Sequence, residues 1–206
     1  MAWMRWVQVV LAVLLQLGRW AWSAWRTRRL RKQLQGSFLL AGASGRPLAV
    51  HFSPKGGCTE AVCAAVALAQ KTVRVQAYSF TSVPVAAALI AAARRGVDVR
   101  ILLDSGMSGE RGSQLAVCRA AGIEVLLDDR HAIAHNKIVL VDDEVVLTGS
   151  FNFSAAAEHS NAENLLILHD RALAALYHDN WQLHHGHSVQ EVAGKDKTDR
   201  KESRAA

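Results

Sequence analysis

Between residues 48 and 127 the sequence alternates between short apolar stretches and alanine-rich stretches, and this alternation restricts the fold more than any other feature. The apolar stretches are rich in β-branched residues and have the length of buried strands. One of the intervening stretches ends at Arg94, Arg95 and Gly96, the order expected at a helix C-terminus, and Thr59 is a candidate N-cap for another. We therefore expect strands at 48–52, 73–80, 97–104 and 123–127, and helices at 59–69, 83–95 and 113–121.

This order of elements predicts an α/β fold in which helices cover both faces of a mixed, mostly parallel sheet. After residue 128 the pattern changes, because the apolar stretches 137–141 and 144–148 are separated only by Asp142 and Asp143. Such spacing predicts an antiparallel hairpin with a two-residue turn. A further strand is expected at 163–168, and a last helix from Arg171 to about His184.

The two ends of the chain differ in composition from this domain, which we place at residues 47–187. Residues 1–36 contain seven Arg or Lys, no Asp or Glu and five of the six tryptophans, whereas the rest of the chain carries a net charge of −1. Tryptophan beside arginine favours a membrane–water interface, so we expect a membrane anchor here. An interfacial amphipathic helix and a cleaved secretory signal, which would leave an exported or periplasmic domain, are the alternatives. Residues 190–206 are charged and nearly free of apolar side chains, which predicts a disordered tail.

The polar residues at the open end of the predicted hairpin form a candidate site. With the turn at Asp142 and Asp143, Lys137 pairs with Thr148 and His135 lies opposite Ser150. Residues two apart on a strand share a face, so an imidazole, an ammonium, a hydroxyl and the amide of Asn152 converge there.

These four groups suit phosphate chemistry. The ammonium and the neutral donors can hold phosphate oxygens, and the imidazole can attack phosphorus or transfer a proton. None of the four is a ligand that Mg²⁺ prefers, so no metal and no cofactor are expected in the site. The structural alternative is that they are ordinary exposed polar residues at the end of a strand.

The same residues carry a family resemblance. His135, Lys137, Asp142, Gly149, Ser150 and Asn152 match without a gap the HxK(x)4D(x)6GSxN signature of the phospholipase D superfamily. The segments FSP (52–54), AYSF (77–80), RGVDV (95–99), GSFNFS (149–154) and NAEN (161–164) extend the match, so the resemblance covers roughly residues 48–185. The chain resembles the small bacterial nucleases of this superfamily, and it is also similar to the single-motif mitochondrial members that resemble cardiolipin hydrolase. The resemblance implies a phospholipase D-like α-β-α sandwich.

The resemblance also implies roles for individual residues. His135 would be the nucleophile that forms a phosphohistidine, and Lys137, Ser150 and Asn152 would bind the phosphate. Glu163 would be the catalytic acid that orients the histidine. Asp142 and Gly149 would be structural members of the motif. Because the chain has one HxK and the reaction needs a second histidine, the resemblance implies a homodimer with a composite active site.

The other histidines and the cysteines are given structural interpretations. His131 and His159 are interpreted as surface loop histidines. His184, His185 and His187 are similar to a metal-binding tract, but two of them are adjacent, and we interpret them as the frayed end of the last helix. Cys58, Cys63 and Cys118 have no disulfide or zinc spacing and are expected to be buried apolar side chains.

Three functions remain open at this point. The first is a metal-independent nuclease acting on DNA or RNA, with a basic groove drawn from five arginines: Arg94, Arg95, Arg100, Arg111 and Arg130. The second is a phospholipase D-type hydrolase of phosphatidyl lipids such as cardiolipin, for which residues 1–36 would provide the membrane contact. The third is an inactive nucleic-acid-binding or scaffold module, which the complete motif disfavours.

Overall fold

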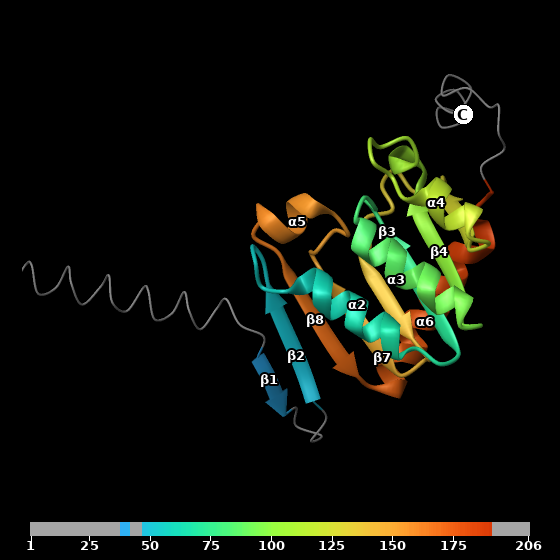
Figure 1. The fold of residues 1–206 in the computed structure, drawn as a ribbon. Coiled ribbons are helices and arrows are strands. Elements are labelled where there is room, and N and C mark those ends of the chain that lie inside the picture. Colours follow the sequence, from blue (N-terminus) through green and yellow to red (C-terminus); the bar gives the residue numbers. More distant parts are fainter. Residues whose placement is uncertain (1–37, 42–46, 191–206) are drawn as a thin grey trace, which may run out of the picture.

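The computed structural model describes residues 38–41 and 47–190. The predicted membrane segment 1–36 and all but the first residue of the predicted tail 190–206 lie outside the described residues. The described residues form one sheet of eight strands in the order β1-β2-β8-β7-β6-β3-β4-β5 (Figure 1). The strands are β1 (Phe38–Ala41), β2 (Pro47–Phe52), β3 (Thr72–Ala77), β4 (Asp98–Asp104), β5 (Glu124–Asp128), β6 (Ile138–Val141), β7 (Val145–Gly149) and β8 (Asn164–His169).

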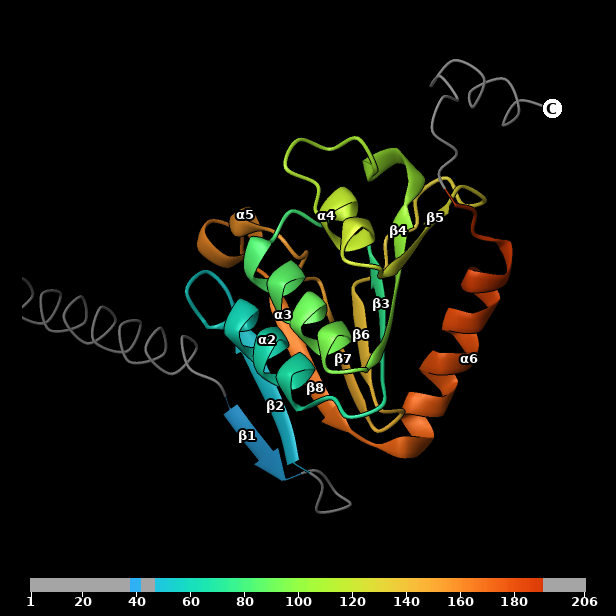
Figure 2. The same ribbon diagram turned by 45° about the vertical axis from the view of Figure 1, so that its right-hand side comes forward.

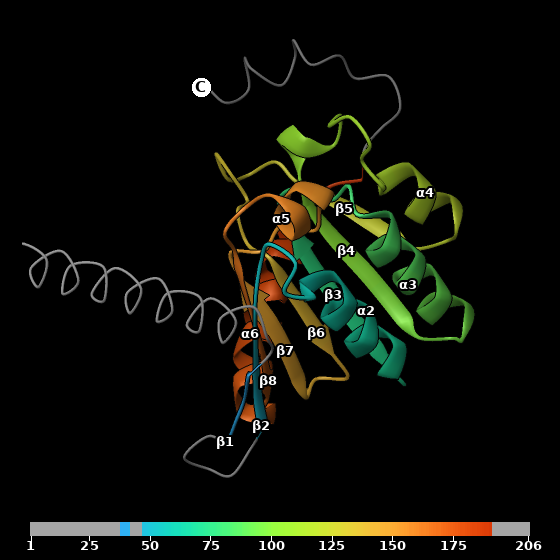
Figure 3. The same ribbon diagram turned by 60° about the vertical axis from the view of Figure 1, so that its left-hand side comes forward.

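Helices lie on both faces of this sheet. They are α2 (Cys58–Leu68), α3 (Val83–Arg94), α4 (Leu115–Ala120), α5 (Ala155–His159) and α6 (Arg171–His187), and a 3-10 turn, η1 (Ser105–Met107), follows β4. Figure 2 shows α2, α3 and α4 on one face and α6 on the other, and Figure 3 shows α6 behind the sheet. The predicted α-β-α sandwich is therefore confirmed.

Each face of the sheet has its own apolar core. In β4, Ile101 and Leu103 face α2 and α3, whereas Leu102 lies between them in sequence and faces α6. The middle of this strand is buried on both faces, which explains its uninterrupted apolar run at residues 101–103. Under α6 the fully buried Trp181 fills the second core, and its indole N–H donates to the Val75 carbonyl at 3.1 Å.

The expectation of a mostly parallel sheet is wrong. Only β3–β4 and β4–β5 pair in parallel, and the other five pairings of the described sheet are antiparallel. The helix α2 connects β2 to β3 along the chain, but β8, β7 and β6 lie between these two strands and run antiparallel to their neighbours. The strand β1 was not expected from the sequence, and it extends the sheet beyond β2.

The start of α2 differs from the prediction. Its N-cap is Gly57, with φ of 75° and no side-chain cap, rather than Thr59. The carboxylate of Glu158 in α5 instead accepts the backbone N–H of Gly57 at 3.2 Å and of Thr59 at 2.7 Å. A side chain far along the chain thus performs the capping that the sequence assigned to a local one.

The end of α6 also differs from the prediction. The helix continues to His187, and Ser188 closes it by donating its hydroxyl to the His184 carbonyl at 2.7 Å. The interpretation of His184, His185 and His187 as a frayed end is therefore wrong. No helix in the described residues 47–190 is long and apolar enough to cross a membrane.

The hairpin β6–β7 has a register one position away from the predicted one. Asp142 and Asp143 do form the turn, with φ of 54° and 55°, and the N–H of Glu144 closes it on the Val141 carbonyl at 3.0 Å. However, Val141 pairs with Val145 and not with Glu144. Glu144 stays outside the ladder because its carbonyl and carboxylate bind the segment between β8 and α6. Extending the observed ladder puts Asn136, and not His135, opposite Ser150.

Candidate active site

The predicted site residues gather at one end of the sheet. His135 and Lys137 precede β6, Ser150 and Asn152 follow β7, and Glu163 precedes β8. These strand ends are neighbours, because Ile138 pairs with Thr148 and Gly149 pairs with Leu165. The shift in register therefore leaves the residues at the same end of the sheet, although it changes which of them lie directly opposite.

The loop that carries His135 is fixed by the strands beside it. The backbone N–H of Ala134 donates to Asp104 at the end of β4 at 2.7 Å. The amide of Asn136 donates to Gln76 of β3 at 3.3 Å, and the Lys137 ammonium donates to the His135 carbonyl at 2.5 Å. These bonds hold the backbone on both sides of His135, whose side chain is exposed to solvent.

Tyr78 joins the site from the end of β3. Its ring lies 4.6 Å from the His135 ring, centroid to centroid, at an interplanar angle of 60°. The Lys137 ammonium lies 5.2 Å from the centroid of the same ring, within the range of a cation–π contact. No role for Tyr78 was predicted from the sequence; the signal that identifies it is its position after a strand that pairs with β6.

Lys137 is a buried ammonium, with 6% of the residue exposed. Burial lowers its pKa below the ordinary value of 10.5, because the charged form loses water, and the nearby carboxylate of Glu163 acts in the opposite direction. The site therefore holds a poorly solvated cation, which binds a phosphate oxygen more strongly than an exposed lysine does.

The two neutral side chains after β7 are placed to donate and accept hydrogen bonds. The hydroxyl oxygen of Ser150 accepts the backbone N–H of Asn164 at 3.1 Å and its side-chain amide at 3.3 Å, which leaves the Ser150 proton for another acceptor. The Asn152 side-chain oxygen is buried without a hydrogen-bond partner among the described residues. An unpaired buried polar atom costs about 1–3 kcal/mol, so this oxygen is an unmet acceptor in the site.

The Glu163 carboxylate is close enough to raise the pKa of Lys137. Among the hydrogen bonds of the described residues, however, none joins Glu163 to the His135 ring. Its carboxylate accepts the side-chain amide of Asn161 at 3.1 Å. Its backbone is tied to Ser53, whose hydroxyl accepts the Glu163 N–H at 3.1 Å. The role of Glu163 in orienting the histidine stays a prediction.

The two remaining motif residues lie in different places. Gly149 is in the site, where an added Cβ would lie 2.2 Å from the Asn164 carbonyl oxygen, so only glycine permits this approach of β7 to β8. Asp142 lies at the opposite end of the hairpin, and its carboxylate accepts the backbone N–H groups of Gln70, Lys71 and Thr72 at 2.8, 2.7 and 2.9 Å. Asp142 thereby fastens the turn to the start of β3.

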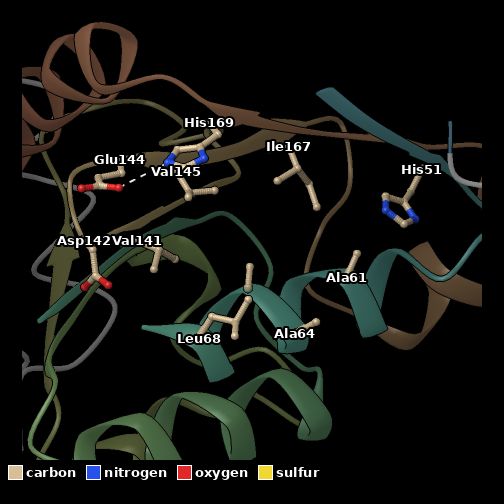
Figure 4. Close-up of a pocket in the computed structure, with 11 residues that line it drawn as sticks. His51, Ala61, Ala64, Leu68, Val141, Asp142, Glu144, Val145, Ile167 and His169 are labelled. Atoms are coloured by element: carbon tan, nitrogen blue, oxygen red, sulfur yellow. Dashed lines mark hydrogen bonds and ion pairs between the residues drawn. The ribbon is translucent and has the colours of Figure 1, made fainter. Parts of the chain in front are cut away.

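An apolar cavity of about 490 Å³ lies away from these residues (Figure 4). It lies between α2 and the strands β7 and β8, with Leu68, Val145 and Ile167 among its lining residues. Of the signature residues, Asp142 alone reaches it. Its location at the turn end of the hairpin separates it from His135 and Lys137.

The cysteines do not contribute to the site. Cys58 and Cys118 are fully buried, as expected from the sequence, whereas Cys63 is only partly buried. Burial raises the pKa of the Cys58 thiol to about 12 and that of Cys118 to about 11, so neither forms a thiolate at neutral pH.

Comparisons with known proteins identify the family. A family model described as "Cardiolipin synthase, PLD-like domain" matches residues 62–183, more than half of the chain. A protein named phospholipase D from Rickettsia felis is 43% identical over 130 residues, which cover 63% of this chain and 65% of that protein. The chain thus spans slightly less than two thirds of that relative's length.

Two further relatives are informative. A mitochondrial cardiolipin hydrolase from Xenopus laevis is 36% identical over 114 residues, covering 55% of this chain and 54% of that protein. The crystal structure of Nuc from Salmonella typhimurium, described as a phospholipase D family member, superposes with a TM-score of 0.67 at 36% identity and covers 71% of this chain and 98% of Nuc. The family model and these relatives, together with the five signature residues at one end of the sheet, show that the chain belongs to the phospholipase D superfamily.

Proposed function

We propose that the chain is a metal-independent phosphodiesterase that cleaves nucleic acid through a phosphohistidine at His135. The observation that carries this proposal is the gathering of His135, Lys137 and Asn152 at one end of the sheet. There an exposed imidazole, a buried ammonium and a side-chain amide lie on neighbouring strand ends. Family membership supports the assignment of phosphodiester chemistry to these groups.

The proposed reaction has two displacements at phosphorus. In the first, a ring nitrogen of His135 forms a bond to phosphorus while the bond to the leaving oxygen breaks, and a second histidine protonates that oxygen. In the second displacement, the second histidine takes a proton from water and the water oxygen attacks phosphorus. The bond between phosphorus and the His135 nitrogen then breaks. Lys137 and the Ser150 hydroxyl stabilise the negative charge that develops on the phosphate oxygens.

The second histidine is proposed to come from another copy of this chain. The sequence contains a single HxK, so a composite site on a two-fold axis would supply two copies of His135. Hybrids of wild-type and His135→Ala subunits test this, because each hybrid would hold one reactive imidazole. When equal amounts of the two subunits exchange at random, about one quarter of the dimers contain two wild-type subunits. Activity should therefore fall to about one quarter of that of the same amount of wild-type protein. Activity of one half would contradict the composite site.

Phosphatidyl lipids are the second candidate substrate. The Rickettsia relative is named phospholipase D and the Xenopus relative is named cardiolipin hydrolase. In addition, two arginines of the expected basic groove are already engaged. Arg95 donates to carbonyls at the end of α2, and Arg100 is paired with Asp98 and Glu124.

Side-by-side assays decide between these substrates. The full-length protein is incubated in excess EDTA with single-stranded DNA and RNA and, separately, with vesicles that contain cardiolipin. We expect faster turnover of nucleic acid, and an acid-labile adduct between substrate and histidine in denatured protein. His135→Asn should lose both turnover and adduct, while His159→Asn, an exposed histidine in α5, should keep both. An adduct that persists in His135→Asn would overturn the assignment of the nucleophile.

Residues 1–36 are proposed to hold the protein at a membrane. The support is their composition, with cations and tryptophans side by side and no acidic residue. Co-sedimentation of the full-length protein with anionic vesicles tests this, and removal of residues 1–36 should abolish it. Vesicle binding that survives the deletion would contradict the proposal.

A further inference from the structure

A second group of reactive side chains lies at the β5 edge of the sheet, outside the site described above. It consists of Asp128 at the end of β5, His131 in the loop that follows, and His184 and His187 in the last turn of α6. One candidate ligand atom from each residue lies within 4.8 Å of all the others. Three imidazoles and a carboxylate thus meet at one point.

The distances match the edges of a metal coordination shell. The Asp128 Oδ2 atom lies 2.8 Å from His184 Nδ1, 3.0 Å from His131 Nδ1 and 3.3 Å from His187 Nε2. In a tetrahedral zinc site with ligand bonds of 2.0–2.1 Å, neighbouring ligand atoms are about 3.4 Å apart. These three distances lie close to that value, and the distances between the imidazole nitrogens are at most 4.8 Å, so modest shifts of these side chains would form the shell.

The backbone around Asp128 orients its carboxylate. The Oδ1 atom accepts the backbone N–H groups of Arg130 at 3.1 Å and His131 at 3.3 Å, so the Oδ2 atom turns toward the imidazoles. The residue is 1% exposed, and such outer contacts are typical of carboxylates that bind metals. Although burial disfavours the charged form of Asp128, the hydrogen bonds from His184, His131 and His187 hold its pKa below the usual range.

The helix α6 presents two of its four histidines to the cluster. His184 and His187 are three residues apart, so they lie on the same face of the helix. The position of this helix end is fixed by the strand-like pair Leu127 and Val189, whose backbones exchange hydrogen bonds of 2.8 and 2.9 Å. His185, which lies between the two, faces elsewhere and stacks on Trp181 at 4.9 Å.

We propose that Asp128, His131, His184 and His187 bind one zinc ion. Imidazole nitrogens with one carboxylate are ligands for zinc and related divalent transition metals, whereas Ca²⁺ and Mg²⁺ prefer all-oxygen shells. Four protein ligands fill a tetrahedral shell and leave no position for a substrate, so the ion has a structural role. It joins the end of β5, the end of α6 and the loop that leads to His135.

The ion is separate from the proposed phosphodiesterase site. Three strand spacings of about 4.8 Å separate β5 from β6. The end of β5 at the zinc cluster and the start of β6 at the phosphodiesterase site therefore lie on the order of 14 Å apart across the sheet. The connection between them is through the backbone, because His131 precedes His135 by four residues in the same loop. The zinc proposal does not depend on which reaction the protein catalyses.

The test measures metal binding directly. The full-length protein without a histidine tag is stripped with a chelator, dialysed, and titrated with Zn²⁺ and, separately, with Co²⁺. We expect one equivalent of zinc and, for cobalt, the intense visible absorption of a tetrahedral complex. At a free zinc concentration roughly 100 times Kd, the melting temperature should rise by about 5–10 °C.

The variants decide whether this cluster is responsible. His184→Gln and His187→Gln should each weaken zinc binding by about tenfold or more and remove the tetrahedral cobalt spectrum. His178→Gln, on the same helix but paired with Asp143, should bind zinc as the wild type does. No zinc binding by the wild type, or an unchanged cobalt spectrum in both cluster variants, would overturn the proposal. The cluster would then be a carboxylate that is hydrogen-bonded to three imidazoles and binds no metal ion.

Discussion

The ring of Tyr78 meets the ring of His135 edge-on, with 4.6 Å between their centroids. The same tyrosine lies under the Lys137 ammonium, so one aromatic ring contacts both residues of the HxK pair. An edge contact restricts rotation of the imidazole, and the face of the ring attracts the cation. The Tyr78 ring is therefore placed to position both residues.

Tyr78→Leu should lower kcat/KM by about three- to thirtyfold, because a cation–π contact contributes about 0.5–2 kcal/mol. Tyr78→Phe keeps the ring and should retain nearly full activity. Steady-state kinetics on a chromogenic phosphodiester provides the measurement. Equal losses in the two variants would show that the hydroxyl, and not the ring, is the functional group.

Lys137 should set an alkaline limit on substrate binding. Its ammonium binds phosphate only when protonated, and burial lowers its pKa below 10.5. KM should therefore rise as pH increases toward this lowered pKa, and the rise should begin at a lower pH than it would with an exposed lysine. Glu163→Gln should move the rise in KM to still lower pH, because the Glu163 carboxylate raises the pKa of Lys137. Lys137→Arg should remove the rise in KM, because arginine stays charged over this pH range. KM measured from about pH 7 to 11 checks this, and a profile unaffected by either variant would contradict it.

Asp142→Asn should destabilise the fold by about 1–2 kcal/mol at neutral pH. The two carboxylate oxygens of Asp142 accept three backbone N–H groups, and in the variant an amide nitrogen, which cannot accept, would replace one of these oxygens. Burial by itself would raise the pKa of Asp142, but the N–H groups of Thr72, Gln70 and Lys71 lower it below 3.8. This stabilisation is present above the unfolded pKa and is lost as pH falls through the folded pKa. The difference between the two proteins should thus shrink in acid.

Urea denaturation at several pH values measures this difference. Asp143→Asn is the matched control, since Asp143 also has positive φ but its carboxylate pairs with His178 at the surface. It should change the free energy of unfolding by less than about 1 kcal/mol. Equal effects of the two substitutions would assign the stabilisation to the turn conformation instead of the carboxylate.

Gly149→Ala should lower stability by about 1–3 kcal/mol and reduce activity, because the new methyl group must push β7 away from the Asn164 carbonyl. The displacement also disturbs the contact between Asn164 and Ser150. Gly186→Ala in α6 provides the control, as no heavy atom lies within 4 Å of its added Cβ. This control should gain up to about 1 kcal/mol from helix propensity. Thermal melting and turnover of both variants are the measurements.

Local sequence patterns predicted most of the elements but not the order of the strands. The alternation through β3, α3 and β4 is visible because each element buries a periodic apolar face. The order of the sheet depends on β8, which follows β7 in the chain and pairs with β2 on its other side. No local pattern encodes that choice, and the same holds for the cap of α2 by Glu158, 99 residues from Thr59.

The candidate site was predicted from spacing, yet its register was not. The turn residues Asp142 and Asp143 were identified correctly, but the extra residue Glu144 is drawn out of the ladder by His169 and Arg171, beyond the reach of hairpin rules. The histidines of α6 were misinterpreted for a related reason. Their partner Asp128 lies 56 residues before His184, so only the folded chain shows that they meet.

The bonds that hold the His135 loop have an entropic consequence. Residues 129–137 form no regular helix or strand, yet Asp104 and Lys137 bond the backbone beside the imidazole and Gln76 bonds the side chain of Asn136. The conformational freedom of this loop is therefore lost during folding, before any substrate arrives. Binding energy from a phosphodiester substrate would then be available for orienting phosphorus against His135, the proposed nucleophile.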